Sequence, residues 1–326
     1  MAGETTTSSL SVDQTAFDRL AYFALRSELL FDQAADVQPT QQSMPGSAVT
    51  FTIFADIAAA TSTLNEVTDV TPTALSDSQV TVTLAEYGNA VVTTAKLRGT
   101  SFLDVDAAAA NIIGYNAGDS IDQVVRDVLA GGTNVVYATG GSTDPSSRTT
   151  VQPEDTITAS DVRKVVAQLR AANVATFNGS YIGYIHPDVS FDFRSATDAA
   201  GFRSSVQYTT AMPFYQGEIG TFESVRFIET PRAKVFTNAS DGSGSSTGSS
   251  ATVDVYCTHI MGRQALAKAH SITDGNGSMP KIVRGNVTDL LMRLQPIGWY
   301  WLGGYGRFRE ASLRRIESAS SIGTNA

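Results

Sequence analysis

The chain has 326 residues, of which 42% are apolar, a net charge of −9 and a single cysteine, Cys257. This length predicts about two domains with a sizeable core, and one cysteine excludes an intrachain disulfide, so we interpret Cys257 as a buried thiol. The acidic balance argues against a general nucleic-acid-binding protein, which needs an excess of Lys and Arg. The sequence has no apolar run of about 18 residues and no basic and apolar leader, so we expect neither a membrane span nor a secretory signal.

The N-terminal region predicts a helix that has no neighbour in sequence to pack on. Residues 1–11 are small and polar, as is typical of a flexible arm. Residues 12–35 carry apolar side chains at helical spacing, among them Phe17 and Leu20. Because no nearby segment offers an apolar face, we expect this helix to dock on a distant part of the chain or on another subunit.

The next region favours strands. Apolar and polar residues alternate over 49–54 and again over 80–84, and 87–97 is a third candidate strand. The intervening residues 55–77 are rich in Thr, Ala, Ser and Asp and show no periodicity. We therefore predict a projecting hairpin, which has too little apolar surface for a core of its own and must rest on another surface.

Residues 101–129 predict one long amphipathic helix. Ser101 is the predicted N-cap, and Asp122 is placed on the polar face. Gly114 and Gly118 each cost about 1 kcal/mol in a helix interior, which predicts a kink or break there. The predicted apolar face consists of Phe102, Val105, Ala109, Ile113, Ala117, Ile121, Val124 and Val128.

The remaining sequence predicts a mixed lobe of helices and strands. Ser160 is the predicted cap of a helix over 161–173, and 261–270 also has helical character. The Gly-rich residues 303–306 predict a hairpin turn, and 238–250 is a flexible insertion of Gly and Ser. Further strands are expected at 134–138, 181–185, 223–229, 233–237, 251–259, 296–302 and within 306–318, with a short helix at 189–196.

No pattern of catalytic residues emerges. The single cysteine excludes a paired Cys-x-x-Cys motif. His186 and His259 are potential metal ligands together with Asp188 or Asp192, but no metal-ligand spacing links them. We interpret these residues as packed or surface side chains, and expect no catalytic residue, metal or cofactor.

A basic cluster stands out near the C-terminus of this acidic chain. Subunit salt bridges or a solvated strand face are the favoured interpretations, and contact with enclosed nucleic acid is the alternative. The cluster consists of Arg307, Arg309, Arg314 and Arg315.

The order of these elements resembles the HK97-like fold of tailed-phage major capsid proteins. A polar arm with a helix, a long hairpin, one long helix, a mixed lobe and returning C-terminal strands follow one another as in that α+β fold. Local sequence resembles the N4-gp56 family of phage major capsid proteins over most of the chain. The segments that carry this resemblance are ALRSELLFDQAAD (24–36), SMPGSAVTF (43–51), VTLAEYGNAVVTTAKLRGTSF (82–102), VRDVLAGGTNVVYA (125–138), YIGYIHPDVSFDF (181–193), GEIGTFESVRFIETPRAKVF (217–236) and VDVYCTHIMGRQAL (253–266).

The resemblance implies a division into four parts. Residues 1–45 would be the N-arm and 46–95 the extended E-loop. The peripheral P-domain would comprise 96–175 and 291–326, built on a spine helix at about 101–130. Residues 176–290 would form the axial A-domain, with the flexible loop at 238–250.

The resemblance also implies the function and partners. The chain would assemble with itself into pentamers and hexamers of an icosahedral phage head that encloses double-stranded DNA without sequence-specific binding. It would be made in the cytoplasm of a host bacterium and end in the virion capsid, with a portal, a separate scaffold protein and a decoration protein as partners. No membrane partner is expected.

Two sets of apolar residues are the predicted subunit contacts. The alternative, that each fills the core of its own subunit, stays open. In the E-loop the residues are Phe51, Phe54, Val80, Val82 and Leu84, and in the N-arm Phe17, Leu20, Phe23 and Leu25.

Three other functions compete with this hypothesis. An encapsulin-like cage shares the fold but holds enzyme cargo. A metal-dependent hydrolase would use His186, Asp188 and His259. A fibre or decoration protein would be trimeric and would not be built on a long internal helix.

Overall fold

The computed structural model describes residues 31–35, 48–54, 56–61, 63–64, 66–67, 69–101, 105–141, 144–195, 218–240, 253–270, 279–285, 289–291 and 293–322. Two compact units are distinguished. In their described parts, the first contains Gly88–Gly118 and Pro280–Trp301, and the second contains Ser27–Tyr87, Asp119–Met279 and Leu302–Ala326. The predicted helix at 12–35 lies outside the described residues except for 31–35. Of the predicted flexible insertion at 238–250, residues 241–250 lie outside the described residues, and 238–240 are the end of a strand rather than part of a loop.

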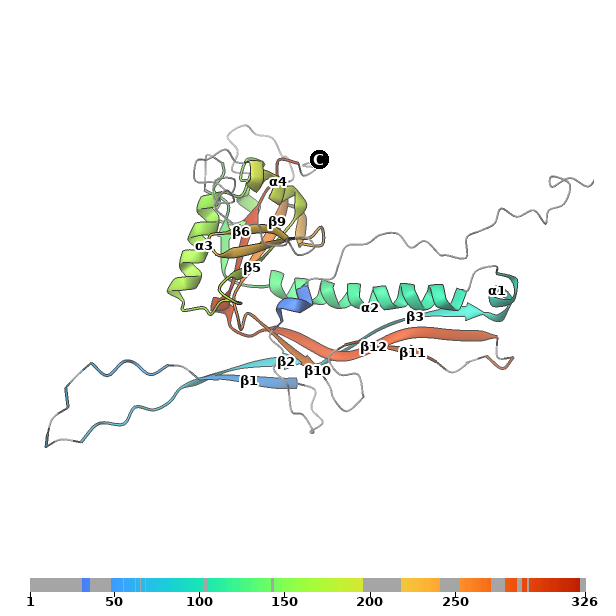
Figure 1. Cartoon of the computed structure of the whole chain (residues 1–326), viewed down its shortest axis with the longest axis horizontal. Helices are drawn as coiled ribbons and strands as arrows, with labels where there is room; N and C mark the ends of the chain where they lie inside the picture. The colour runs from blue at the N-terminus through green and yellow to red at the C-terminus, as the bar shows by residue number, and fades with distance from the viewer. Residues whose placement is uncertain are drawn as a thin grey trace, which may run out of the picture. The chain divides into compact units, whose positions relative to one another are not determined.

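A seven-stranded mixed sheet is the centre of the second unit (Figure 1). Its strand order is β4-β13-β9-β5-β7-β6, with β8 also paired to β9. The β5–β7 and β4–β13 pairs are parallel, and the others are antiparallel. The strands are β4 (Val135–Tyr137), β5 (Tyr181–Ile185), β6 (Glu218–Phe222), β7 (Val225–Glu229), β8 (Val235–Ser240), β9 (Val253–Met261) and β13 (Leu313–Ser318).

Two helices, α3 (Ala159–Ala171) and α4 (Pro187–Ser195), pack on this sheet and build the main core. The buried stripe of α3 falls at helical spacing, as expected for a helix that covers a sheet. Thr158, rather than the predicted Ser160, caps α3, and its hydroxyl accepts a hydrogen bond from the backbone N–H of Asp161. The core includes Val162, Val165, Val166 and Leu169 of α3, Val189 and Phe193 of α4, and Phe222, Phe227, Tyr256, Ile260 and Ile316 of the sheet.

The β1–β2 hairpin also belongs to the second unit. β1 (Ala48–Phe54) and β2 (Asp77–Thr83) are antiparallel, with Phe51 opposite Val80 and Val49 opposite Val82. One face of the hairpin is buried in a small cluster with β10 (Leu266–His270) and Phe308. In Figure 1 the hairpin and the loop that joins its strands extend away from the seven-stranded sheet. A projecting hairpin was predicted, and these residues form one.

Two predictions for the residues beside this hairpin are wrong. Residues 266–270 form the strand β10, whereas 261–270 were expected to be helical. Gly303–Gly306 lie inside the long strand β12 (Leu294–Arg307) and pair with β10, so they are not a turn. In both places the local composition favours another structure, and pairing with a strand distant in sequence overrides it.

The long helix α2 (Val105–Ala130) confirms the main prediction, with corrections at both ends. The glycines at 114 and 118 do not interrupt it. Ser101 is the C-cap of a separate short helix, α1 (Ala95–Thr100), rather than the N-cap of α2, and Thr94 caps α1. The buried apolar positions include Ala109, Ile113, Ala117, Ile121, Val125 and Leu129, so Val125 and Leu129 replace the predicted Val124 and Val128. Phe102 lies outside the described residues.

In the first unit, the N-terminal part of α2 contacts strands β3 (Ala85–Thr94) and β12. The Trp299 indole N–H of β12 donates to Asn116 Oδ1 of α2 at 2.9 Å, and the Thr93 hydroxyl of β3 donates to Asp106 Oδ1 at 3.2 Å. Strands β3, β11 and β12 belong to one sheet, in which β3 and β11 both pair with β12. Strand β11 (Lys281–Arg284) is antiparallel to β12 and lies at the edge of this sheet.

Three short 3-10 helices complete the described structure: η1 (Phe31–Ala34), η2 (Arg148–Thr150) and η3 (Glu310–Ser312). Among the helices that the structure describes, none has the length and apolar character needed to cross a membrane.

Candidate assembly surface

The β1–β2 hairpin separates its apolar residues into a buried root and an exposed distal part. At the root, Phe51 and Val82 are buried, and the Phe51 ring meets the Phe308 ring edge-on with centroids 5.6 Å apart. Val80 and Leu84 are partly buried against the same cluster. Four of the five predicted E-loop contact residues therefore pack within their own chain, which is the alternative that the sequence left open.

The distal part of the hairpin carries large apolar side chains in solvent. Phe54 is 70% exposed, and Val67 is 92% exposed. A folded chain rarely exposes a continuous series of such residues unless another surface covers them. The exposed series consists of Phe54, Ile57, Leu64, Val67, Val70 and Leu75.

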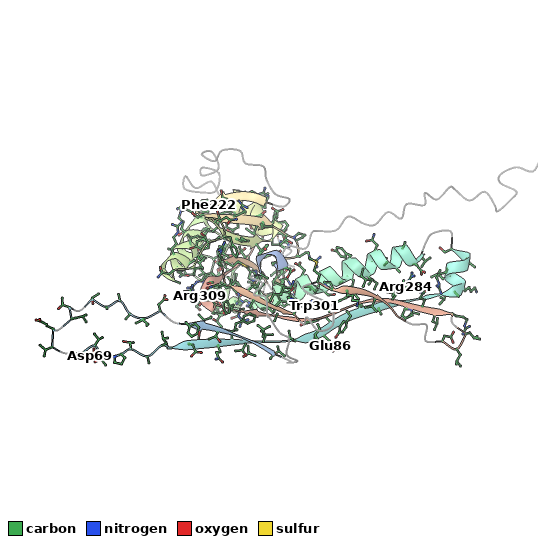
Figure 2. All side chains as sticks on the ribbon, turned by 60° about the horizontal axis from the view of Figure 1, so that its bottom comes forward. Asp69, Glu86, Phe222, Arg284, Trp301 and Arg309 are labelled. Carbon is green, nitrogen blue, oxygen red and sulfur yellow. The ribbon has the colours of Figure 1, made fainter. Side chains whose placement is uncertain are left out.

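The hairpin is also uniformly acidic. No Lys or Arg occurs between Arg26 and Lys96. Figure 2 shows Asp69 in the distal part of the hairpin. The carboxylates of this region, Asp56, Glu66, Asp69 and Asp77, are not balanced by any cation of the hairpin, so a cationic partner surface would complement them.

Strand β2 packs on a surface made of Ala and Gly residues from β10 and β12. Ala267 and Ala269 of β10 pair with Gly306 and Gly304 of β12, so the four share one face of the ladder. A Cβ at Gly306 would lie 2.7 Å from Val82 Cγ2, and one at Gly304 would collide with the backbone oxygen of Thr83. At Gly304 the hairpin backbone approaches too closely for any side chain, and at Gly306 the buried side chain of Val82 occupies the space that a Cβ would need.

The opposite face of the same β10–β12 ladder holds the described end of the N-terminal region. Asp32 of η1 accepts hydrogen bonds from Lys268 Nζ at 2.9 Å and from the Tyr305 hydroxyl at 2.6 Å. Burial raises the pKa of Tyr305, and the nearby Asp32 carboxylate raises it further, so the phenol stays a donor. The Lys268 side chain is almost fully buried, and Asp32 supplies the counter-charge that burial requires.

Phe31 completes this anchor. Its side chain is fully buried, and its ring lies 4.6 Å from that of Tyr184. Its backbone N–H donates to Asp122 Oδ1 at 3.0 Å. Asp122 is thus buried, not on the polar face of α2 as predicted, because Phe31 and Arg232 both bind it, the latter at 3.2 Å. The N-arm residues predicted to make subunit contacts, Phe17, Leu20, Phe23 and Leu25, lie outside the described residues.

Three of the four clustered arginines bind the C-terminal carbonyl groups of helices. Arg307 donates to Val128 O at 3.1 Å, and Arg315 donates to Ala130 O, both at the end of α2. Arg309 donates to Ala172 O, at the end of α3, at 3.0 Å. Cations stabilise this end of a helix because the last carbonyls lack intrahelical partners and the helix dipole is negative there.

Arg315 also joins a buried ion network with Glu317. Its Nε lies 2.8 Å from Glu317 Oε1 as an ion pair, and the fully buried Glu317 accepts two hydrogen bonds from Arg148. Arg314 points to the other face of β13 by strand alternation, and its buried Nε has no hydrogen-bond partner among the described residues. Arg307, Arg309 and Arg315 therefore have intramolecular partners that local sequence did not indicate.

The residues of the hydrolase hypothesis do not form a common site. The ring of His186 lies beside Asp188, with Nδ1 3.4 Å from Oδ2, and Asp188 accepts the hydroxyl hydrogen bond of Tyr256 at 2.9 Å. His259 is fully buried, and strand alternation places it on the face of β9 opposite Tyr256. Within the described part of the chain, no three His, Cys, Asp or Glu residues are grouped so that they could hold a metal ion.

The model of a family described as phage capsid protein matches residues 6–322. The chain belongs to the phage capsid protein family. A capsid protein of this family is a structural protein of the virion shell and not an enzyme, which excludes the hydrolase hypothesis. No curated protein matches the chain in sequence.

Solved capsid structures share the fold of this capsid protein. The capsid of Ralstonia phage GP4 is 14% identical, with a TM-score of 0.75 over 95% of this chain and 96% of the other. The cyanophage Pam1 capsid asymmetric unit is 14% identical, with a TM-score of 0.72 over 99% and 100% of the two chains. The capsid of Helicobacter pylori bacteriophage KHP30 is 10% identical, with a TM-score of 0.70 over 98% and 100%. The predicted α+β, HK97-like fold is confirmed.

Proposed function

We propose that this capsid protein builds the icosahedral head of a tailed phage of the N4-gp56 type, as pentamers and hexamers that enclose double-stranded DNA. The observation that carries the proposal is the exposed apolar series of the β1–β2 hairpin. In a lone chain these side chains remain in water, and in a closed lattice each copy can cover them for its neighbour. The self-covering of an apolar surface by symmetry is what drives the assembly of a homo-oligomeric shell.

The hairpin acts as the E-loop of the shell and lies across a neighbouring subunit. Its root is fixed in its own chain by Phe51 and Val82, so the distal residues are presented with little loss of conformational freedom on binding. Each contact is modest, and its repetition around every symmetry axis makes the lattice cooperative. Residues 1–45 act as an N-arm that binds a second neighbour, tethered at Phe31 and Asp32.

The other parts follow the division expected from the sequence. Residues 96–175 and 291–326 form the P-domain, and 176–290 form the A-domain. The net charge of −9 is consistent with a shell that encloses DNA without binding its phosphates tightly. The chain is made in the host cytoplasm, and a scaffold, a portal and a decoration protein are its partners during and after assembly.

The test is to remove the exposed apolar series and leave the fold intact. Ile57, Leu64, Val67, Val70 and Leu75 are replaced together by Ser, and particles are examined by electron microscopy and their molar mass measured. The expected result is a folded chain, by circular dichroism and thermal unfolding, that forms no shells. The matched control replaces Phe191 and Ile322, which are exposed elsewhere, and should assemble normally. Normal shells from the hairpin variant would contradict the proposal.

A further inference from the structure

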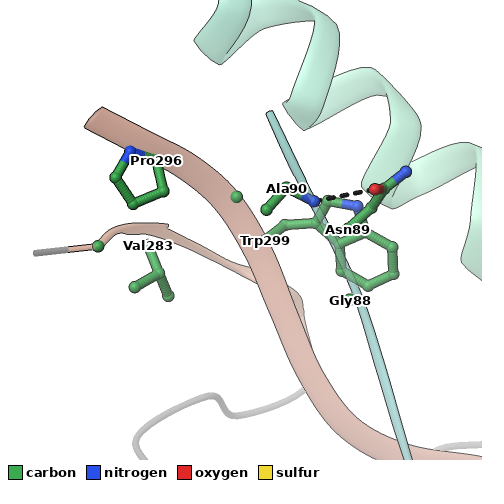
Figure 3. A pocket seen from close by; sticks show the side chains of 8 residues that line it. Gly88, Asn89, Ala90, Val283, Pro296 and Trp299 are labelled. Atoms are coloured by element: carbon green, nitrogen blue, oxygen red, sulfur yellow. Dashed lines mark hydrogen bonds between the residues drawn. The ribbon is translucent and has the colours of Figure 1, made fainter. Parts of the chain in front are cut away.

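The first unit carries an open groove of about 490 Å³ beside β3, β11 and β12 (Figure 3). Its lining consists of Gly, Ala, Val and Pro residues together with Asn89 and Trp299. None of these side chains gains or loses a proton near neutral pH, so the groove offers no group through which acid could act. A cluster that does offer such a group lies in the second unit, where β5 leads into α4.

His186 is the residue between β5 and α4, and it caps the helix. Its carbonyl oxygen accepts the first hydrogen bond of α4, from the Ser190 N–H at 2.9 Å, and Pro187 follows at the helical position that favours proline. Its imidazole Nδ1 accepts the N–H of Asp188 at 3.2 Å, which is the bond that Ser, Thr, Asp or Asn usually provides at the start of a helix. Because Nδ1 accepts this bond, the ring is neutral and carries its proton on Nε2.

Asp188 and Tyr256 lie beside the ring. Asp188 Oδ2 is 3.4 Å from His186 Nδ1, and the same oxygen accepts a hydrogen bond from the Tyr256 hydroxyl at 2.9 Å. The Tyr256 ring lies 5.0 Å from the imidazole, and 16% of the His186 side chain is exposed. Burial raises the pKa of Tyr256, and the Asp188 carboxylate raises it further, so the phenol stays a donor and fixes Asp188 beside the ring.

Glu229, at the end of β7, is a second carboxylate whose charge acts on the ring. It accepts a hydrogen bond from the Ser190 hydroxyl at 2.6 Å and lies 3.7 Å from Arg194. Burial lowers the pKa of His186 below its ordinary value of 6.5, and the carboxylates of Asp188 and Glu229 oppose this effect without cancelling it. The cap is therefore intact above pH 6.5, and it is lost as pH falls through the lowered pKa of the folded chain.

A proton on Nδ1 is incompatible with this cap. The nitrogen that accepts the Asp188 N–H would become a donor, and the positive ring would lie at the positive end of the helix dipole. Asp188 Oδ2, 3.4 Å away, is placed to accept the new N–H. We propose that His186 is an acid-operated cap, which holds the first turn of α4 while the ring is neutral and releases that turn to pair with Asp188 when the ring is protonated.

The release stays local. Val189 and Phe193 of α4 are buried in the main core, and these contacts do not depend on the imidazole. Asp192 accepts hydrogen bonds from the N–H and the hydroxyl of Ser321, so α4 also holds the described C-terminal end of the chain. The first turn therefore loosens while these contacts persist. This inference goes beyond the proposed function, because it concerns the single chain and holds whether or not the chain assembles.

Hydrogen exchange of the unassembled chain tests the cap. The two amides to compare are Asp188 N–H, which His186 holds, and Asp161 N–H, which the Thr158 hydroxyl holds at the start of α3. The hydroxyl does not titrate, so Asp161 is the matched control within the same chain. Both amides belong to first turns, which open locally far more often than the whole chain unfolds. The effect of His259 on global unfolding therefore does not enter.

Between pH 7.5 and 5.0, protection of the Asp188 N–H should fall roughly fivefold to tenfold after correction for the intrinsic exchange rate, as expected for the loss of one N-cap, while protection of the Asp161 N–H stays constant. In His186→Asn, whose side-chain oxygen can cap at either pH, both amides should keep their protection. An equal fall at both amides of the parent chain, or a fall at residue 188 that persists in His186→Asn, would overturn the inference.

Asp188→Asn tests the pairing that follows release. It keeps an acceptor for Tyr256 and removes the charge that attracts the proton, so the midpoint of the loss should move to lower pH. His270→Asn, which removes a histidine of β10 whose pKa burial also lowers, should leave the midpoint unchanged. A midpoint that does not move in Asp188→Asn, in a chain that circular dichroism shows to be folded, would rule out the pairing of His186 with Asp188.

Discussion

Asp32 and Lys268 form an ion pair of 2.9 Å across 236 positions of sequence, and it anchors the described end of the N-terminal region on β10. The Lys268 side chain is 3% exposed, whereas that of Asp32 is 36% exposed. Asp32 therefore supplies counter-charge to a buried lysine, while Asp32 itself also faces water.

Because Lys268 is buried and Asp32 is partly exposed, substitutions of the two residues should lower the free energy of unfolding by different amounts. Asp32→Ala should lower the free energy of unfolding by about 1–3 kcal/mol, because it removes a carboxylate that lies 2.9 Å from a buried ammonium. Lys268→Met should cost less, since it replaces the charge with an apolar chain of similar length. Urea denaturation of the unassembled chain measures both. A larger loss for Lys268→Met would contradict this account.

Phe31 should be the most costly residue of the anchor to remove. Phe31→Ala deletes a fully buried ring that packs against Tyr184, and a cavity of this kind costs about 3–5 kcal/mol. The same substitution at Phe191, which is half exposed, should change stability by less than about 1 kcal/mol. Thermal unfolding of the two variants, compared with the parent chain, decides the matter.

The hairpin phenylalanines should separate folding from assembly. Phe51→Ala should lower stability by about 3 kcal/mol, since Phe51 is buried against Phe308. Phe54→Ala should leave stability unchanged and reduce the yield of shells, since Phe54 is exposed in the single chain. Unfolding curves and particle counts on the same preparations test both statements. A stable Phe51→Ala chain would show that the root does not hold the hairpin.

His259 should make the free energy of unfolding depend on pH. Burial lowers its pKa to about 3, helped by the positive charges of Arg315 and Arg126, whereas the unfolded chain has the ordinary value of 6.5. Between these values the unfolded state binds the proton and the folded state does not, so stability falls as pH drops below about 6.5, by up to about 1.4 kcal/mol per unit. His259→Leu should remove this part of the slope. Equal slopes for the two chains between pH 6.5 and 4 would refute it.

The arginines near the C-terminus should act on stability and not on DNA. Arg309→Ala removes the hydrogen bond to Ala172 O and should cost about 1 kcal/mol, and Arg307→Ala should cost slightly more because Glu310 also loses its partner. DNA retention by filled heads should not change. A loss of DNA at high salt, with unfolding unaffected, would favour the nucleic-acid alternative instead.

Local sequence pattern was sufficient to predict an element where its own neighbouring residues determine its structure. The strand at 181–185 and the long helix were predicted because alternation and helical periodicity are recorded in neighbouring residues. Asp122 was misplaced because its burial depends on Arg232 and Phe31, 110 and 91 positions away, about which periodicity carries no information. The Ala- and Lys-containing segment at 266–270 favours a helix in isolation, and only its pairing with β12 makes it a strand.

The candidate surface was predictable in kind but not in detail. The sequence indicated a hairpin without a core. Alternation could not show which of its apolar residues are buried, because the Ala and Gly residues on which β2 packs come from β10 and β12, which are distant in sequence. Lys268 had no recognisable signal at all. A single lysine in an apolar segment resembles a solvated residue until its carboxylate is located.

The two glycines beneath β2 set how freely this family can diverge. A Cβ at Gly304 or Gly306 would press on Thr83 or Val82 at the root of the hairpin, whereas Leu64 and Val67 in its distal part are 78% and 92% exposed. A lineage can therefore change the reach and chemistry of its hairpin by insertion or substitution without rebuilding the platform that aims it.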